Sequence, residues 1–278
     1  MTDGGTTLKA LFDERFGVAP DVPDGPVDPA LARLISRRIC RRYRPEPLED
    51  ALMATLLAAA QSAPAKSDLQ QYAIVLTDEA ARREIGGLIG DAWIADAPHL
   101  LLFCGDLRRG RRIAAMKDRN YDNNNLDSFM NAAVDAGLAL MMFVMAADAA
   151  GVGTCPISMV RNHIERVTEL LALPEGVFPV AGLTVGRPAA TRAMAMRLPP
   201  AIVVHHGRYD DSALETELAA YDARRHERQP IPPASQKNAT AYGQGDVVHW
   251  SDNVARQLSL PERAGFAAFL KSRGIEVG

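Results

Sequence analysis

The sequence is short of the residues that mark several common protein classes. Of its 278 residues only three are cysteines, Cys40, Cys104 and Cys155, and their spacing does not suit a metal site. An odd number of cysteines without such spacing argues against a disulfide framework and favours a reducing, cytoplasmic location. Aromatic residues make up only 6% of the chain, whereas alanine and leucine are abundant, which favours helices.

Neither sign of charge dominates. Lysine and arginine number 31 against 34 aspartates and glutamates, a formal net charge of −3. This balance argues against binding nucleic acid or an anionic membrane through the whole surface.

The longest apolar stretch, 136–147, has 12 uncharged residues. Because a bilayer span needs roughly 20, we expect a buried helix there. Residues 1–20 contain no apolar segment flanked by basic residues, so no signal peptide is predicted.

Helical and strand patterns alternate along the chain and predict a sheet wrapped by helices. Short runs of β-branched and aromatic residues indicate strands, and apolar residues three and four apart indicate helices. Strands are expected at 72–76, 100–104, 178–185 and 201–205, and helices at 8–16, 49–61, 78–90, 126–150, 161–171, 212–225, near 253 and at 261–272.

The length fits one large domain or two small ones. Residues 1–28 mix Gly, Pro and Asp and are interpreted as an N-terminal arm, which leaves 29–278 as a single domain. Between about 226 and 248 the composition changes to Pro, Gln, Ser, Asn and Gly. A long stretch of this kind is usually functional or disordered, so we predict a loop excursion.

Five arginines occur within the nine residues 36–44. One guanidinium group can donate two parallel hydrogen bonds to two phosphate oxygens, so this cluster indicates a phosphate-binding site. Arg37, Arg38 and Arg41 are three and four positions apart, so one helical turn could direct them at a single anion. Composition alone favours the alternatives, a solvated basic turn or a small nucleic-acid patch.

Other local features point less clearly to chemistry. The polar loop 63–72 between a helix and a strand has a position typical of ligand contacts, although ordinary connections are commoner. Gly151 and Gly153 follow a helix and lack a third glycine, so a dinucleotide fold is rejected. Cys155 has no visible base and is interpreted as an inert, buried residue. No pair of histidines has ligand spacing with a third ligand, so no metal site is predicted.

A series of motifs occurs in order along the chain: Gly-Val-Gly-Thr at 151–154, Arg-Asn-His-Ile-Glu at 161–165, Leu-Pro-Glu-Gly-Val-Phe-Pro at 173–179, Gly-Leu-Thr-Val-Gly-Arg-Pro at 182–188, Arg-Leu-Pro at 197–199 and Trp-Ser-Asp at 250–252. Taken in order, these motifs resemble the nitroreductase family of FMN-dependent enzymes, and in particular its oxygen-insensitive, NADPH-using nitroreductases and flavin reductases. The resemblance implies an α+β fold with a central mixed or antiparallel sheet wrapped by helices. It also implies an intertwined homodimer that binds FMN at its interface.

The resemblance assigns the flavin site to four segments, each of which departs from the family pattern. Ile39 replaces a serine of the phosphate-binding motif, Asp68 replaces an amide, and Ala195 replaces a lysine. The segment 156–159 replaces Tyr-Ile-Gly-Gly, and its backbone amides are expected to face the flavin ring near N5. The implied cofactor-binding residues are Arg37, Arg38, Ile39, Arg41, Ala65, Lys66, Ser67, Asp68, Gln70, Pro156, Ile157, Ser158, Met159 and Arg197.

The implied activity is two-electron, ping-pong hydride transfer from NAD(P)H to a small planar acceptor: a nitro-aromatic compound, a quinone or a flavin. No catalytic side chain is expected, because the cofactor carries the chemistry. A carboxylate at Asp68 and a missing cation at Ala195 predict a flavin that is harder to reduce, or a more selective site. The alternatives are a flavin-binding protein of the same fold with little turnover and, from the arginines alone, a nucleic-acid module. The composition of 227–246 leaves the choice between NADPH and NADH open.

Overall fold

The structure is a computed structural model that describes residues 6–277. Residues 1–5 of the predicted arm and residue 278 lie outside the described residues. The chain divides into two compact units, each made of segments distant in sequence. We call Met1–Arg38 with Ala193–Pro261 the helical unit, and Ile39–Arg192 with Glu262–Gly278 the sheet unit. The predicted boundary between an arm and one domain remains a prediction.

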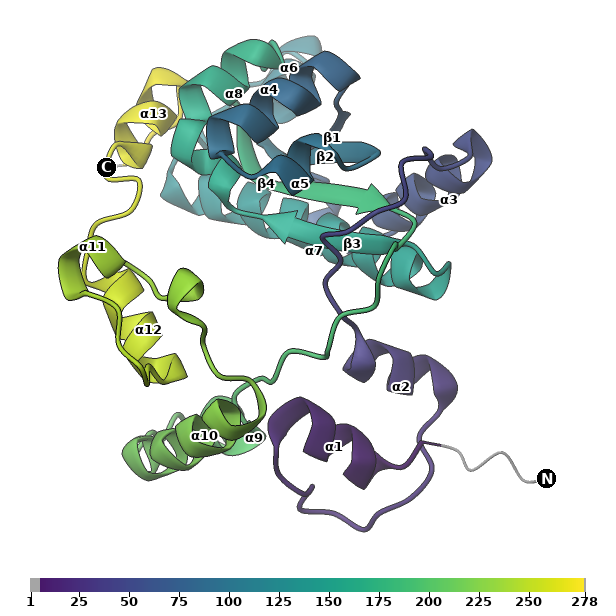
Figure 1. The fold of residues 1–278 in the computed structure, drawn as a ribbon. Helices are drawn as coiled ribbons and strands as arrows, with labels where there is room; N and C mark the ends of the chain where they lie inside the picture. Colours follow the sequence, from purple (N-terminus) through teal and green to yellow (C-terminus); the bar gives the residue numbers. More distant parts are fainter. Residues whose placement is uncertain (1–5, 278) are drawn as a thin grey trace. The chain divides into compact units, whose positions relative to one another are not determined.

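The sheet unit contains a four-stranded sheet in the order β1-β2-β4-β3, in which all neighbours are antiparallel (Figure 1). The strands predicted at 72–76, 100–104 and 178–185 are confirmed, and a strand missed by the sequence analysis is added at the sheet edge. The bounds are β1 (Tyr72–Leu76), β2 (His99–Asp106), β3 (Gly153–Ile157) and β4 (Val177–Gly186).

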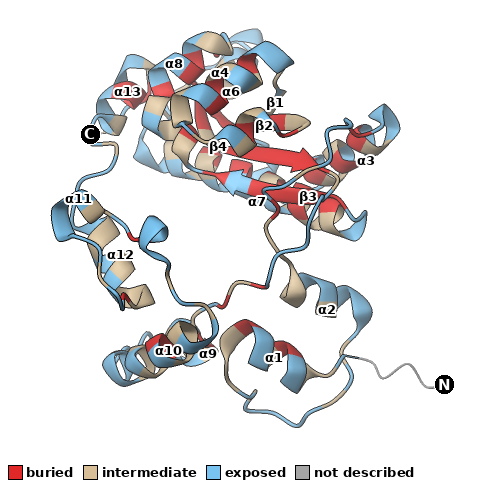
Figure 2. Cartoon of the chain, viewed as in Figure 1, coloured by how far each residue is buried: buried red, intermediate tan, exposed pale blue. Residues whose placement is uncertain are grey.

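Strand β2 is buried on both faces, because its side chains alternate between two apolar clusters. Leu101 and Phe103 join helix α3 (Asp50–Gln61) and helix α7 (Leu126–Ala149) on one face. Leu100, Leu102 and Cys104 face a second cluster, to which the helices that precede β2 and those that follow β3 contribute. Figure 2 shows buried residues concentrated in these strands. A third cluster joins Phe178 to the C-terminal residues Phe269 and Ile275.

Helix α7 contains the longest apolar stretch. By length and composition it alone, among residues 6–277, is apolar enough to cross a membrane. Its buried residues include Ala136, Ala139 and Phe143, which are 0% exposed and pack against the sheet. Helix α7 is therefore a core helix of the sheet unit, as the sequence predicts for 136–147.

The remaining helices of the sheet unit are short. Helix α4 begins where Asp78 accepts a hydrogen bond from the Ala81 amide and ends at Gly90, whose φ of 80° suits glycine. The predicted helix 161–171 is divided into a 3-10 turn and one α-helix. These elements are η1 (Lys66–Asp68), α4 (Glu79–Ile89), α5 (Ala92–Ala95), α6 (Arg108–Met116), η2 (Met159–His163), α8 (Ile164–Leu170) and α13 (Phe266–Ser272).

The helical unit has no strand among its described residues. Its buried residues include the polar Arg15, Asp222 and Gln236 and the apolar Met196 and Tyr221. Its elements are α1 (Leu8–Phe16), α2 (Pro29–Ser36), α9 (Pro200–Val203), α10 (Leu214–Arg228), η3 (Pro233–Ser235), α11 (Ala239–Tyr242) and α12 (Trp250–Leu258).

One sequence prediction in this unit is wrong. The strand predicted at 201–205 is helix α9 followed by irregular chain, because Pro200 occupies the first helical position and no strand is available to pair with this segment in the described part of the unit. The loop excursion at 226–248 remains a prediction; α10 extends to Arg228, and the short elements η3 and α11 lie within the predicted range.

Candidate functional site

The arginines of 36–44 are not presented by a helical turn, which corrects the sequence interpretation. Helix α2 ends at Ser36, and Arg37 has extended backbone angles, φ −52° and ψ 138°. The chain stays extended because the Cys40 amide donates to the Thr154 carbonyl at 2.9 Å. Arg37 and Arg38 belong to the helical unit, whereas Ile39 and Arg41 belong to the sheet unit.

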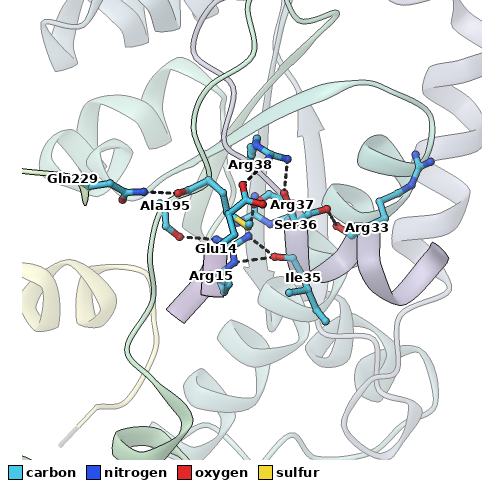
Figure 3. Close-up of polar contacts among 10 residues, drawn as sticks. Glu14, Arg15, Arg33, Ile35, Ser36, Arg37, Arg38, Ala195 and Gln229 are labelled. Atoms are coloured by element: carbon cyan, nitrogen blue, oxygen red, sulfur yellow. Dashed lines mark hydrogen bonds and ion pairs between the residues drawn. The ribbon is translucent and has the colours of Figure 1, made fainter. Parts of the chain in front are cut away.

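In the helical unit, Arg37 and Arg197 are both linked to Arg15, a residue that the sequence analysis missed. Arg15 Nη2 donates to the Arg37 carbonyl at 2.6 Å, and the Arg197 amide donates to the Arg15 carbonyl at 2.8 Å. Figure 3 shows the Arg15 side chain directed at the segments of Ile35, Arg37 and Ala195. The structure thus brings together the segments of two predicted phosphate ligands that are 160 positions apart in the sequence.

The guanidinium groups of this cluster are only partly neutralised. Arg38 pairs with Glu14 at 2.9 Å. Arg37 Nη1 is buried and has no hydrogen-bond partner among residues 6–277. Buried polar groups are nearly always hydrogen-bonded, and a buried guanidinium nitrogen without an acceptor fits an anionic ligand. The residues present therefore fit a phosphate group.

Arg197 also lines a cavity of about 510 Å³ within the helical unit, together with Phe16, Tyr221 and Trp250. Trp250 packs edge-on against Tyr221, with ring centroids 5.5 Å apart. The next residue, Ser251, donates its amide to Asp222 at 3.1 Å and its hydroxyl to the same carboxylate. The Trp-Ser-Asp motif thus holds the Trp250 ring in the lining of the cavity that Arg197 also lines.

In the sheet unit, Ile39 and Arg41 belong to an extended segment beside β3. Cys40 packs so closely against Gly153 that a Cβ there would lie 2.7 Å from the cysteine sulfur. The Tyr43 hydroxyl donates to the Cys40 carbonyl at 2.6 Å, and burial raises the pKa of Tyr43. Arg41 lies over the Trp93 ring, 5.1 Å from its centroid, so its guanidinium is held by a cation–π contact.

The predicted loop residues Ala65, Lys66, Ser67, Asp68 and Gln70 precede β1. Three of them, Ser67, Asp68 and Gln70, have positive φ angles of 49°, 58° and 51°. Such angles cost free energy in residues other than glycine and are typical of functional loops. Gln70 Nε2 donates to Asp68 Oδ1 at 3.0 Å, so the carboxylate that departs from the family pattern is bound by its neighbour.

Asp135 on α7 holds this loop, a role that no local sequence pattern indicates. Its side chain is 1% exposed. Its oxygens accept hydrogen bonds from the backbone amides of Lys66 and Gln71, both at 2.9 Å. One buried carboxylate on a core helix therefore fixes both ends of the strained segment.

The fourth predicted segment, 156–159, spans the end of β3 and the start of η2. Ile157 is buried opposite Gly182 of β4, whereas Pro156 and Ser158 are exposed. The Ser158 carbonyl accepts the Arg161 amide at 3.0 Å, and this contact begins the 3-10 turn at Met159. The segment is thus a fixed corner of the sheet with two exposed residues.

The cysteines contribute no reactive thiol to this region. All three are buried and unpaired. Burial raises the pKa of Cys104 to about 12 and also raises the pKa of Cys40. No group of three His, Cys, Asp or Glu residues in the range 6–277 could hold a metal ion.

Comparison with known proteins identifies the family. The profile of the nitroreductase family matches residues 34–187, and the profile of its C-terminal domain matches residues 196–277. The chain belongs to the nitroreductase family. Among curated nitroreductase relatives, it is 35% identical to "FMN reductase [NAD(P)H]" of Bacillus subtilis (strain 168) over 249 residues, which cover 88% of this chain and 96% of the relative. It is 30% identical to "Oxygen-insensitive NADPH nitroreductase" of Salmonella typhimurium over 250 residues, 89% of this chain and 98% of that protein.

Solved nitroreductase structures share the fold over nearly the whole chain. The structure of B. megaterium NfrA2 has a TM-score of 0.82 and 31% identity, and the match covers 91% of this chain and 100% of that one. The NADPH:FMN oxidoreductase from Vibrio harveyi, solved with NAD+, has a TM-score of 0.78 and 26% identity over 89% of this chain and 98% of that one. The family and the α+β fold predicted from the sequence are thus confirmed. The flavin-binding residues and the homodimer remain predictions.

Proposed function

We propose that this nitroreductase is an FMN-dependent NAD(P)H oxidoreductase that reduces nitro-aromatic, quinone or flavin acceptors by a ping-pong mechanism. The observation that carries the proposal is the buried, unpartnered Nη1 of Arg37 in the same arginine cluster as Arg197. The names of the relatives, FMN reductase and NADPH nitroreductase, support the same activity.

The residues of this chain would bind FMN and orient it for the reaction. When bound, FMN supplies two-electron chemistry, since its N5 can accept a hydride from a nicotinamide and pass it to an acceptor. Arg37 and Arg197 would hold the phosphate through charge-assisted hydrogen bonds. The loop at 65–70, which Asp135 fixes, and the corner at 156–159 would contact the ring. Ping-pong kinetics follow if nicotinamide and acceptor use one pocket in turn.

The test begins with the absorption spectrum of the protein purified without added flavin. We expect a flavin spectrum and NAD(P)H oxidation with menadione or nitrofurazone, with parallel double-reciprocal lines. Replacing Arg37 or Arg197 with Gln should weaken FMN binding by about 10- to 100-fold, since a hydrogen bond to a charged group contributes about 1.5–3 kcal/mol.

Arg83→Gln is the matched control, because Arg83 is exposed and pairs only with Glu79 in the described part of the chain. This variant should bind FMN like the wild type. A colourless protein that takes up no FMN would refute the proposal. A protein that binds FMN but oxidises no NAD(P)H with either acceptor would instead be a flavin-binding protein of the same fold.

We also propose the homodimer implied by the family, since α7 carries an exposed apolar stripe. Met130, Val134 and Leu138 recur every four residues, with exposed fractions of 56%, 53% and 37%. A contiguous apolar surface of this kind is typical of a protein interface. Light scattering should give twice the chain mass for the wild type and a monomer for Val134→Glu. A monomeric wild type would contradict the proposal.

A further inference from the structure

Arg15, in helix α1, lies outside the part of the chain that the family profiles match, yet it is deeply buried. Its exposed fraction is 7%. Within residues 6–277, all its side-chain hydrogen bonds end on backbone carbonyls. Nε and Nη2 donate to Ile35 at 2.8 and 2.5 Å, Nη2 to Arg37 at 2.6 Å, and Nη1 to Ala195 at 2.7 Å (Figure 3).

These carbonyls belong to the two segments that carry the predicted phosphate ligands. Ile35 and Arg37 bracket the end of α2, and Ala195 lies two residues before Arg197. The Arg197 amide returns a hydrogen bond to the Arg15 carbonyl at 2.8 Å. One residue therefore fastens both segments through a planar group whose donors are fixed relative to one another.

Arg15 also adds positive charge that these contacts do not cancel. Its acceptors are neutral carbonyls. Burial, together with the charges of Arg197, Arg37 and Arg38, lowers the pKa of Arg15 to about 10, and Glu14 offsets this only in part. Opposite charge favours a buried cation, so a phosphate dianion would relieve the repulsion within the cluster.

We propose that Arg15 is a positioning residue of the FMN phosphate site, which sets the backbones of Arg37 and Arg197 and adds a third positive charge to them. The inference rests on the proposed function, because it takes FMN as the ligand. It assigns to the N-terminal segment a part in cofactor binding that the family match, which begins at residue 34, does not reach.

The experiment compares FMN with riboflavin, which lacks the phosphate. Binding to the full-length apoprotein is followed by quenching of flavin fluorescence. Arg15→Gln should weaken FMN binding at least tenfold and change riboflavin binding by less than twofold. Arg15→Lys should fall between Gln and the wild type, since it keeps the charge but lacks the planar fork.

Two controls separate this role from a general loosening of α1. Arg228→Gln removes the 2.9 Å ion pair with Asp13, which joins α1 to α10. Lys9→Gln removes an exposed cation from the same helix. Both should bind FMN like the wild type.

The inference is overturned if folded Arg15→Gln or Arg15→Lys binds FMN as the wild type does. It is also overturned if FMN and riboflavin weaken equally, or if Arg228→Gln weakens FMN as much as Arg15→Gln. Should Arg15→Gln fail to fold, Arg15→Lys decides by the same criteria. A wild type that binds neither flavin refutes the proposed function and this inference with it, whereas an unaffected Arg15 variant refutes only the inference.

Discussion

In the sheet unit the core consists of three clusters of apolar side chains, whereas in the helical unit buried and half-buried polar side chains bind backbone groups. Arg15 and Gln229 hold carbonyls of distant segments, and Asp222 holds Ser251. Apolar packing is non-directional and fixes a fold through many small contacts. Polar contacts are few and directional, and they can hold a charged cluster that apolar residues would exclude. The helical unit therefore suits the binding of an anion.

The largest loss of stability is expected when a large side chain is removed from the apolar core of the sheet unit. Phe103 is 0% exposed, and its ring centroid lies 6.2 Å from that of Phe143. Phe103→Ala should lower the free energy of unfolding by about 3–5 kcal/mol, measured by denaturant titration. Leu76→Ala is the control, because this strand residue is 46% exposed. Equal losses in the two variants would show that the cluster is not the source of stability.

Asp135 is the clearest exception to this difference between the two units, because it makes polar contacts inside the sheet unit. Asparagine offers one oxygen and one amide group where both Lys66 and Gln71 present N–H donors, so a donor would face a donor. Asp135→Asn should lower the free energy of unfolding by about 2 kcal/mol, measured by the same titration.

Asp118→Asn is the matched control for this change. Asp118 is exposed and has a φ of 53°, which asparagine tolerates. It should stay within about 0.5 kcal/mol of the wild type. A loss in Asp118→Asn as large as that in Asp135→Asn would contradict the role of Asp135 in holding the loop.

The same difference explains what the sequence could predict. Apolar periodicity is local, so the positions of β1, β2, β4 and α7 could be predicted from it. The polar links join residues far apart: Arg15 and Ala195 are 180 positions apart, and Lys66 and Asp135 are 69. No local pattern marks such partners, which is why Arg15 and Asp135 were missed. Strand β3 was missed because its sequence, Gly-Thr-Cys-Pro-Ile, is short and carries a proline that only an edge strand tolerates.

A smaller effect is expected at Gln229 in the helical unit. Its amide donates to the Met194 carbonyl at 2.6 Å and accepts the Met196 amide at 3.1 Å. Gln229→Ala leaves both backbone groups unpaired and should cost about 1–2 kcal/mol. Hydrogen exchange should speed up at 194–197 and stay unchanged in β2. Gln244→Ala, an exposed residue of the same unit, is the control. Faster exchange in β2 would show that the two units do not open separately.

The smallest effect concerns a histidine at the start of β2. His99 Nε2 accepts the Leu48 amide at 2.9 Å, which requires the neutral ring. Burial and the nearby Arg82 lower the pKa of His99, while Asp50 opposes them. His99 therefore takes up a proton more readily in the unfolded chain than in the folded one. The stabilisation that neutral His99 provides above pH 6.5 is lost as the pH falls through its folded-state pKa. The free energy of unfolding of the wild type should therefore fall between pH 7 and pH 5.

His99→Gln tests this sign, because glutamine can accept the same amide without titrating. Its unfolding free energy should change less between pH 7 and pH 5 than that of the wild type. His206→Gln should keep the wild-type slope, since the exposed His206 side chain makes no hydrogen bond to the rest of residues 6–277. If the slope of His99→Gln matched that of the wild type, the acid sensitivity would have to arise outside this contact, and the sheet unit would depend on pH through other groups.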